Sequence, residues 1–190
     1  MSTYQLKASA YHLKLPEIKK LIFATRSFRN RCLLKTLFWA GLRREEAAQL
    51  DIRDIDFERK RIQVRGKGNK IRIVPIIDDE FLSDLQHLVA GRNSGPVFQN
   101  PRSEHLTIRM INKITRQVGE QANITNPNPS LKHINPHLFR HSIARYLKGK
   151  GFSAEWVQNF LGHSSYKTTM DMYGTISLDE MQDEAVKRLG

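Results

Sequence analysis

The chain has 190 residues, of which 39% are hydrophobic; this suffices for the core of one globular domain and is too much for a disordered tail. Lys and Arg total 31 against 19 Asp and Glu, and the formal net charge of +12 indicates a polyanionic partner such as nucleic acid. The single cysteine, Cys32, excludes an internal disulfide framework and a cysteine-rich zinc site, and no apolar run approaches the ~18 residues of a membrane span.

The first part of the chain is predicted to be an arm followed by helices. Residues 1–15 have no clear periodicity and suggest a linker or N-terminal arm. Pro16 suits the first position of a helix over residues 17–25. Apolar residues at helical spacing predict a buried helix that is interrupted near Gly41, and a short helix containing Ala47 follows it. The apolar residues of the buried helix are Leu33, Leu34, Leu37, Phe38 and Leu42.

The pattern then changes from helical to alternating. Apolar and polar residues alternate on both sides of residues 66–69, whose sequence is Gly-Lys-Gly-Asn. The alternating apolar residues are Ile62, Val64, Ile71 and Ile73. This pattern predicts an antiparallel β-hairpin with Lys67 at its tip.

The rest of the chain is predicted to be helical. Three sets of apolar residues mark helices: Phe81, Leu82, Leu85, Leu88 and Val89; Leu106, Ile111, Ile114 and Val118; Leu138, Ile143, Ala144 and Leu147. Pro136 begins the third of these, Ser153 caps the next helix and Gly162 ends it. A short helix up to about Tyr173 and a terminal helix opened by Ser177 complete a mainly α fold with one small antiparallel sheet.

Four polar clusters carry side chains suited to phosphoryl transfer. They are Gly41-Leu-Arg43-Arg-Glu-Glu46, the hairpin tip Gly66 to Arg72, His137-Leu-Phe-Arg140-His141, and Leu161-Gly-His163 followed by Tyr173. Guanidinium groups match the charged oxygens of a phosphoryl transition state, while lysine, histidine and tyrosine supply an acid, a base and a nucleophile. No carboxylate cluster suits a two-metal site, so we expect metal-free chemistry.

These clusters, in this order, resemble the catalytic domain of tyrosine recombinases, the phage integrase and Xer-type family. Gly-Leu-Arg43 with Glu46 resembles the first arginine box and His137-x-x-Arg140 the second. The hairpin lysine and the segment from Leu-Gly-His163 to Tyr173 also match the family pattern. The resemblance covers residues 15–185 and implies the catalytic-domain fold over residues 16–190, without the N-terminal core-binding domain that precedes it in most members.

The resemblance implies a role for each matching residue. Tyr173 attacks the scissile phosphate and forms a 3′-phosphotyrosine, which requires neither ATP nor a cofactor. Arg43 and Arg140 hold the non-bridging oxygens, and Lys67 protonates the leaving 5′-oxygen. The supporting roles are these: His137 assists as base, His163 hydrogen-bonds the phosphate, Glu46 orients the first arginine box, and His141 lies behind the site.

The implied partners are double-stranded DNA and other recombinase protomers, assembled on DNA as a tetrameric synapse. The DNA-binding candidates are Lys70, Arg72, Arg109, Lys113 and Arg116. The expected location is the cytoplasm, in association with the nucleoid, with no membrane partner.

Alternative readings remain open from the sequence. A type IB topoisomerase shares these active-site residues, and a non-catalytic DNA-binding regulator would tolerate loss of Tyr173. Lys70 is the alternative to Lys67 as the catalytic lysine. His133, His137 and His141 are spaced for metal binding, but Pro136 prevents them from sharing one helical face.

Overall fold

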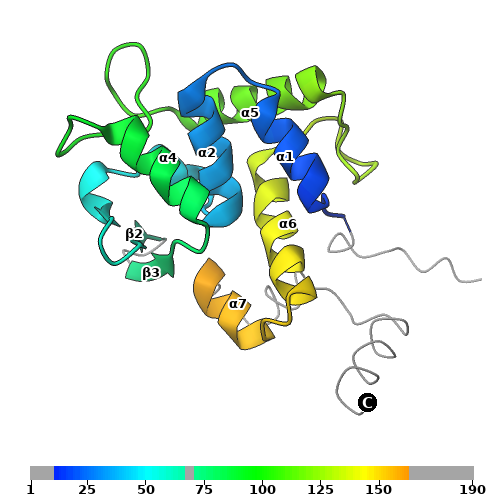
Figure 1. Ribbon diagram of the computed structural model, residues 1–190. Coiled ribbons are helices and arrows are strands. Elements are labelled where there is room, and N and C mark those ends of the chain that lie inside the picture. The colour runs from blue at the N-terminus through cyan, green and yellow to red at the C-terminus, as the bar shows by residue number, and fades with distance from the viewer. Residues whose placement is uncertain (1–10, 67–70, 163–190) are drawn as a thin grey trace, which may run out of the picture.

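The computed structural model describes residues 11–66 and 71–162, and Figure 1 shows their arrangement. The elements in chain order are α1 (Leu15–Phe23), α2 (Phe28–Trp39), α3 (Arg44–Ala48), the 3₁₀ helix η2 (Ile52–Asp54), β1 (Ile55–Asp56), β2 (Arg61–Arg65), β3 (Ile71–Pro75), α4 (Asp79–Val89), α5 (Ile108–Ala122), α6 (Pro136–Gly149) and α7 (Ala154–Leu161). This mainly α architecture with a small antiparallel sheet confirms the predicted fold class.

Helix α2 lies at the centre of the helical part of the molecule. Every residue from Cys32 to Phe38 is buried, and the helix contacts α1, α3, α4 and α6. A helix that is enclosed on all sides cannot have a polar face exposed to water. Its one buried charge, Lys35, pairs with Glu80 at 2.6 Å and Asp84 at 2.5 Å on α4.

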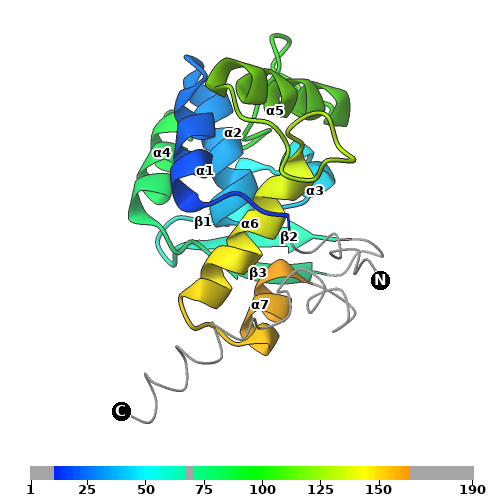
Figure 2. The ribbon, with the colours of Figure 1, turned by 90° about the vertical axis from the view of Figure 1, so that its right-hand side faces the viewer.

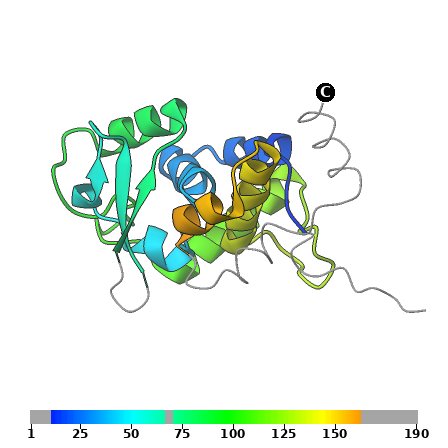
Figure 3. The same ribbon diagram turned by 90° about the horizontal axis from the view of Figure 1, so that it is seen from below.

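The three strands form an antiparallel sheet in the order β1-β2-β3 at one end of the helical bundle (Figures 1 and 3). The predicted hairpin is β2 and β3, which pair Gln63 with Ile73 and Arg65 with Ile71. Strand β1 was not predicted, because its two residues are too short for an alternating pattern. Ile62, Val64 and Val74 are buried, so one face of the hairpin belongs to the core.

Some helix boundaries differ from the sequence-based expectation. Helix α5 begins at Ile108, after its N-cap Thr107, so Leu106 lies before the helix and not within it. Helix α1 covers Leu15–Phe23 instead of residues 17–25, because Glu17 accepts a hydrogen bond from the backbone N–H of Lys14 at 2.8 Å and so caps an earlier start. Helix α2 ends at Trp39, because Gly41 has φ +58°, which an α-helix cannot contain. Leu42 is therefore a buried loop residue and not part of the helix.

The last described helices bring the C-terminal boxes back to the sheet. Helix α6 begins at Pro136, as predicted, with Asn135 as its N-cap. Ser153 caps α7, and Gly162 ends it with φ +65°, both as predicted. Helix α7 contacts both α6 and β3 (Figure 2). The predicted helices beyond Gly162 lie outside the described residues.

The segment before α1 also packs on α6. Leu13 is buried, and its backbone N–H donates to the Ser142 hydroxyl at 2.9 Å. Among the helices formed by the described residues, none is both long and apolar enough to cross a membrane.

Candidate active site

Arg43 occupies a sharp turn between α2 and α3. The positive φ of Gly41 makes the turn, and a Cβ at this glycine would lie 2.7 Å from Cδ2 of Leu161, so only glycine fits here. Arg43 is the N-cap of α3, with an extended backbone and a side chain that is 40% exposed. The turn thus directs one guanidinium group out of the core while its backbone stays fixed.

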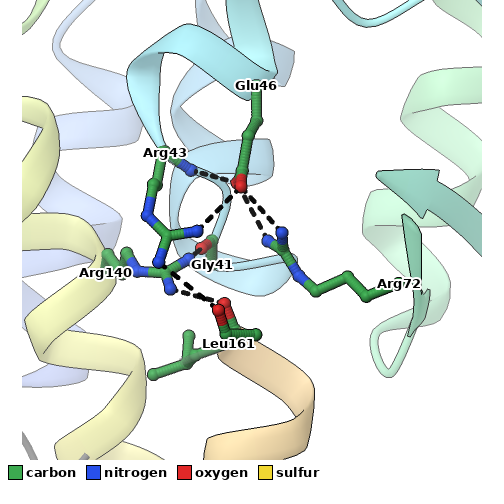
Figure 4. Close-up of polar contacts among 7 residues, drawn as sticks. Gly41, Arg43, Glu46, Arg72, Arg140 and Leu161 are labelled. Carbon is green, nitrogen blue, oxygen red and sulfur yellow. Dashed lines mark hydrogen bonds and ion pairs between the residues drawn. The ribbon is translucent and has the colours of Figure 1, made fainter. Parts of the chain in front are cut away.

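Glu46 lies one turn further along α3 and is the centre of the polar network in Figure 4. Its carboxylate accepts hydrogen bonds from the Arg43 backbone N–H at 2.7 Å and from Arg43 Nη1 at 2.9 Å. It also accepts hydrogen bonds from both terminal nitrogens of Arg72, at 2.7 and 2.9 Å. This arrangement suits the orienting role expected for Glu46.

The pKa of Glu46 shows how strongly its ionised form is held. Burial by itself raises this pKa, because a charged carboxylate loses its hydration. The hydrogen bonds and charge of Arg72, the backbone N–H of Arg43 and the charge of Arg140 outweigh burial and lower the pKa to about 2. The carboxylate therefore stays negative at any pH at which the protein works.

Arg140 on α6 is the largest fully buried side chain among the described residues, with 1% of its surface exposed. It donates to the backbone carbonyls of Gly41 and Leu161, which come from the α2–α3 turn and the end of α7 (Figure 4). Burial and the nearby charge of Arg43 lower its pKa, yet a guanidinium remains protonated near neutral pH. Arg140, from the second arginine box, is thus hydrogen-bonded both to the first arginine box at Gly41 and to the segment that begins at Leu161.

His137 and His141 form a pair on α6. Their Nε2 atoms lie 2.8 Å apart and their ring centroids 4.3 Å apart. A hydrogen bond between two ring nitrogens requires one donor and one acceptor, so at least one of the two facing Nε2 atoms carries no proton. His141 is therefore in direct contact with the ring of His137.

Both histidines are held in the neutral form. His137 lies at the surface, but protein atoms remove part of its hydration, and this together with Arg140 and Arg43 lowers its pKa. Burial, His137, Arg140 and His12 lower the pKa of His141 to about 4. A neutral imidazole can accept a proton at pH 7, which a general base must do.

The side chains together form a cationic cluster beside a neutral base. Arg43, Arg72 and Arg140 carry three positive charges against the single negative charge of Glu46, which leaves a net charge of +2. A phosphodiester carries one negative charge, and further charge develops on its oxygens in the transition state of transfer. The arrangement is suited to holding a phosphate and stabilising its reaction.

The DNA-binding candidates that the structure describes fall into two groups, three exposed side chains on α5 and Arg72 within the polar network. Arg109, Lys113 and Arg116 are exposed on α5, where Arg116 pairs with Glu120 at 2.8 Å.

Arg72 was expected to bind DNA. Its side chain is 14% exposed, and its terminal nitrogens are bonded to Glu46. Its position inside the network could not be found from the sequence, since alternation along a strand does not identify a partner on α3.

Four candidates are not among the described residues: Lys67, Lys70, His163 and Tyr173. His133 lies in the loop before α6, with Nδ1 3.8 Å from Glu120 Oε1, so it does not share a helical face with the His137 pair. Within residues 11–66 and 71–162, no group of three or more His, Cys, Asp or Glu side chains is arranged to hold a metal ion.

Comparison with known proteins places the whole described fold in one family. The sequence profile of the phage integrase family matches residues 12–178. The tyrosine recombinase XerD of Staphylococcus epidermidis (strain RP62A) is 30% identical over 95% of this chain and 65% of its own length. The tyrosine recombinase XerC of Oceanobacillus iheyensis is 34% identical over 84% of this chain and 53% of its own length. The chain thus spans about half to two thirds of these relatives.

A solved structure also resembles this fold closely. The crystal structure of the XerH site-specific recombinase bound to difH substrate, a pre-cleavage complex, superposes with a TM-score of 0.74 at 27% sequence identity. The match covers 97% of this chain and 56% of the XerH chain. It includes the helices and the sheet that bring the arginine boxes together.

Proposed function

The chain belongs to the phage integrase family, and from this membership we propose that it is the catalytic domain of a site-specific DNA recombinase. The observation that carries the proposal is the convergence of Arg43, Arg140 and His137 from α3 and α6 around one cationic position. The relative XerH, solved with its difH substrate, supports double-stranded DNA as the partner.

We infer a cleavage step in which Tyr173 is the nucleophile. Its hydroxyl gives its proton to neutral His137 as the phenolic oxygen bonds to the scissile phosphorus. The bond between phosphorus and the 5′-oxygen breaks, and Lys67 donates a proton to that oxygen. Arg43 and Arg140, with His163, stabilise the charge on the non-bridging oxygens.

The same chemistry in reverse rejoins the DNA. A free 5′-hydroxyl from the partner strand attacks the 3′-phosphotyrosine, loses its proton to Lys67 and releases Tyr173, which takes a proton back from His137. The phosphotyrosine is itself a phosphodiester, so one diester replaces another at each step. We therefore propose that the reaction needs neither ATP nor a metal ion.

Covalent capture tests this function. Random-sequence duplexes nicked on one strand would be incubated with the protein, and DNA joined to protein would be amplified to find the cleavage site. Cleavage next to the nick releases a short fragment, so the strand cannot be rejoined and the adduct accumulates. We expect the wild-type protein to form an adduct at Tyr173.

The Tyr173→Phe variant is the matched control, because it removes one hydroxyl and leaves the ring. It should bind the selected DNA as the wild type does and form no adduct. Adduct formation by Tyr173→Phe would contradict the assignment of the nucleophile. Relaxation of supercoiled plasmids that lack the selected site would instead favour the topoisomerase reading.

A further inference from the structure

Arg72 projects from β3 into the polar network and not toward solvent. Both of its terminal nitrogens donate to the carboxylate of Glu46, at 2.7 and 2.9 Å, in the fork geometry that arginine makes with a carboxylate (Figure 4). The Arg72 side chain is 14% exposed and that of Glu46 is 4% exposed. If Arg72 left this pair to bind DNA, a buried carboxylate would lose its main cationic partner.

The same two carboxylate oxygens hold Arg43. Oε1 of Glu46 accepts from Nη1 of both arginines, and Oε2 accepts from Arg72 Nη2 and from the Arg43 backbone N–H. Each oxygen therefore bridges β3 and the turn before α3. Because the guanidinium fork is planar, Arg72 fixes the plane of the carboxylate, and that plane fixes the direction of Nη1 of Arg43.

Arg72 is itself held in place by the end of α7. A Cβ on Gly162 would lie 2.4 Å from Cδ of Arg72, so the arginine stem packs directly on this glycine. The carbonyl of Gly162 lies 3.5 Å from Nη2 of Arg43. Three segments of the chain thus meet at the Arg72 side chain.

This ion pair is poorly explained by stability alone. Burying two charges costs hydration energy that their attraction does not always recover. In addition, Nε of Arg72 is buried and has no hydrogen-bond partner among residues 11–66 and 71–162. A geometric role accounts for the arrangement better, because the pair restricts the direction of a guanidinium that is 40% exposed at the site.

We propose that Arg72 is a positioning residue that acts through Glu46 to aim Arg43 at the scissile phosphate, and that it makes no contact with DNA. The target of Arg43 in this proposal rests on the proposed function. The coupling between Arg72 and Arg43 does not, and it can be measured in the protein without DNA.

The first measurement is therefore made on the free protein. Nitrogen-15 NMR of arginine side chains resolves guanidinium groups whose rotation is slowed by a fixed partner. Arg72→Gln should remove or broaden the Arg43 Nη signals, whereas Arg61→Gln, a change at an exposed arginine of β2, should leave them unchanged. Unchanged Arg43 signals in folded Arg72→Gln protein would overturn the proposal, whether or not the protein is a recombinase.

The second measurement is single-turnover cleavage of the selected DNA at saturating protein. Arg72→Gln should slow cleavage roughly tenfold to a hundredfold, as expected when a group that orients a functional side chain is removed. In Arg72→Lys, which keeps the charge of the cluster, the affinity for DNA and its salt dependence should stay unchanged. In an Arg43→Gln background, Arg72→Gln should cause no further loss, because its effect passes through Arg43. Additive losses with Arg72→Gln, or a smaller salt slope with Arg72→Lys, would overturn the proposal.

Arg72→Lys separates geometry from charge and guards against misfolding. Lysine keeps the positive charge beside Glu46 but cannot form the two-point contact. We expect Arg72→Lys to keep the melting temperature near that of the wild type and still to cleave slowly. Full recovery of cleavage by lysine would show that charge alone is needed, and the positioning role would be rejected.

Discussion

The neutral state of His137 is the residue-level feature on which proton transfer depends. Its pKa is lowered by partial loss of hydration, by Arg140 and Arg43, and by Arg44, while Glu45 acts in the opposite direction. Arg44 and Glu45 lie on the solvent side of α3 and pair with each other at 2.6 Å. These two residues offer a way to change the basicity of His137 without altering the groups that hold phosphate.

We predict that cleavage falls only as the pH drops below the ordinary histidine pKa of about 6.5, since His137 must be unprotonated. Arg44→Gln should move this fall to higher pH, and Glu45→Gln should move it to lower pH. Each shift should stay below one pH unit, because even ~4 Å apart two unit charges in water interact by only ~1 kcal/mol. The measurement is the pH profile of single-turnover cleavage; shifts in the same direction would contradict the prediction.

The stability of the protein must be followed over the same pH range. The pKa of His141 is lowered to about 4 in the folded protein, so between pH 6.5 and pH 4 the unfolded chain binds more protons than the folded chain. The free energy of unfolding therefore decreases as the pH falls through this window. Thermal unfolding at each pH separates this loss from the titration of His137.

Lys67 gives a second prediction at the residue scale. An alkoxide leaves poorly at neutral pH, so Lys67→Ala should slow cleavage by roughly 10²- to 10⁴-fold if this lysine is the general acid. A sulfur atom in place of the 5′-bridging oxygen leaves as a thiolate without a proton, and DNA carrying it should restore cleavage by Lys67→Ala.

Two further variants serve as controls for the rescue by the sulfur-substituted DNA. Arg140→Ala should not be rescued by the sulfur substitution, because Arg140 stabilises oxygens that the substitution leaves alone. Rescue of Lys70→Ala in place of Lys67→Ala would identify the other hairpin lysine as the acid. Failure to rescue either variant would exclude the hairpin as its source.

At the scale of elements, α5 presents three exposed basic side chains, Arg109, Lys113 and Arg116. Arg109 and Lys113 are exposed, and no acidic residue lies within four positions of either one in the sequence. Arg116, in contrast, pairs with Glu120 at 2.8 Å. Phosphate contacts release counterions, so their number appears in the salt dependence of binding. The free charges of α5 should contribute more to DNA binding than the paired one.

We predict that Arg109→Glu and Lys113→Glu each weaken DNA binding and reduce the slope of log affinity against log salt by roughly one unit. Arg116→Glu should have a smaller effect. Arg59→Glu is the control: its side chain is 74% exposed in the β1–β2 turn, at the opposite end of the strands from the hairpin tip. Fluorescence anisotropy at several salt concentrations measures the slopes, and equal slopes for all variants would contradict a role for α5.

At the scale of the whole molecule, the net charge of +12 favours a polyanionic partner such as DNA. Residues 177–189 carry apolar side chains at helical spacing, beginning at a predicted capping box of Ser177 and Glu180. We propose that this segment docks on a neighbouring protomer when DNA brings copies of the chain together. Tetramers then form only on DNA.

We predict that the free protein is monomeric and that deletion of residues 177–190 impairs synapsis more than binding to a single DNA site. Light scattering gives the mass of the free protein, and native gels separate single-site complexes from synaptic ones. Ser177→Ala is a milder variant that weakens the predicted cap and should reduce synapsis partially. Equal loss of binding and synapsis on deletion would mean that the segment belongs to the fold of its own domain.

The sequence by itself determined most of the helices, the β-hairpin and the order of the boxes. Helical and alternating periods, together with Pro136, Ser153 and Gly162, predicted α6, α7 and the hairpin, because caps and periodicity act over a few residues. The pair of His137 and His141 is also local, since residues four apart lie on one helical face.

Only the tertiary structure decided which of these residues meet. Arg140 reaches the carbonyl of Gly41 across 99 positions of sequence, and Arg72 reaches Glu46 across 26. Nothing local distinguishes an arginine that will face solvent from one that will lie under α7, because burial depends on how helices and strands pack. The sequence therefore offers Arg72 only as a DNA-binding candidate, and it takes the packing of β3 against α7 to show that Glu46 is its partner.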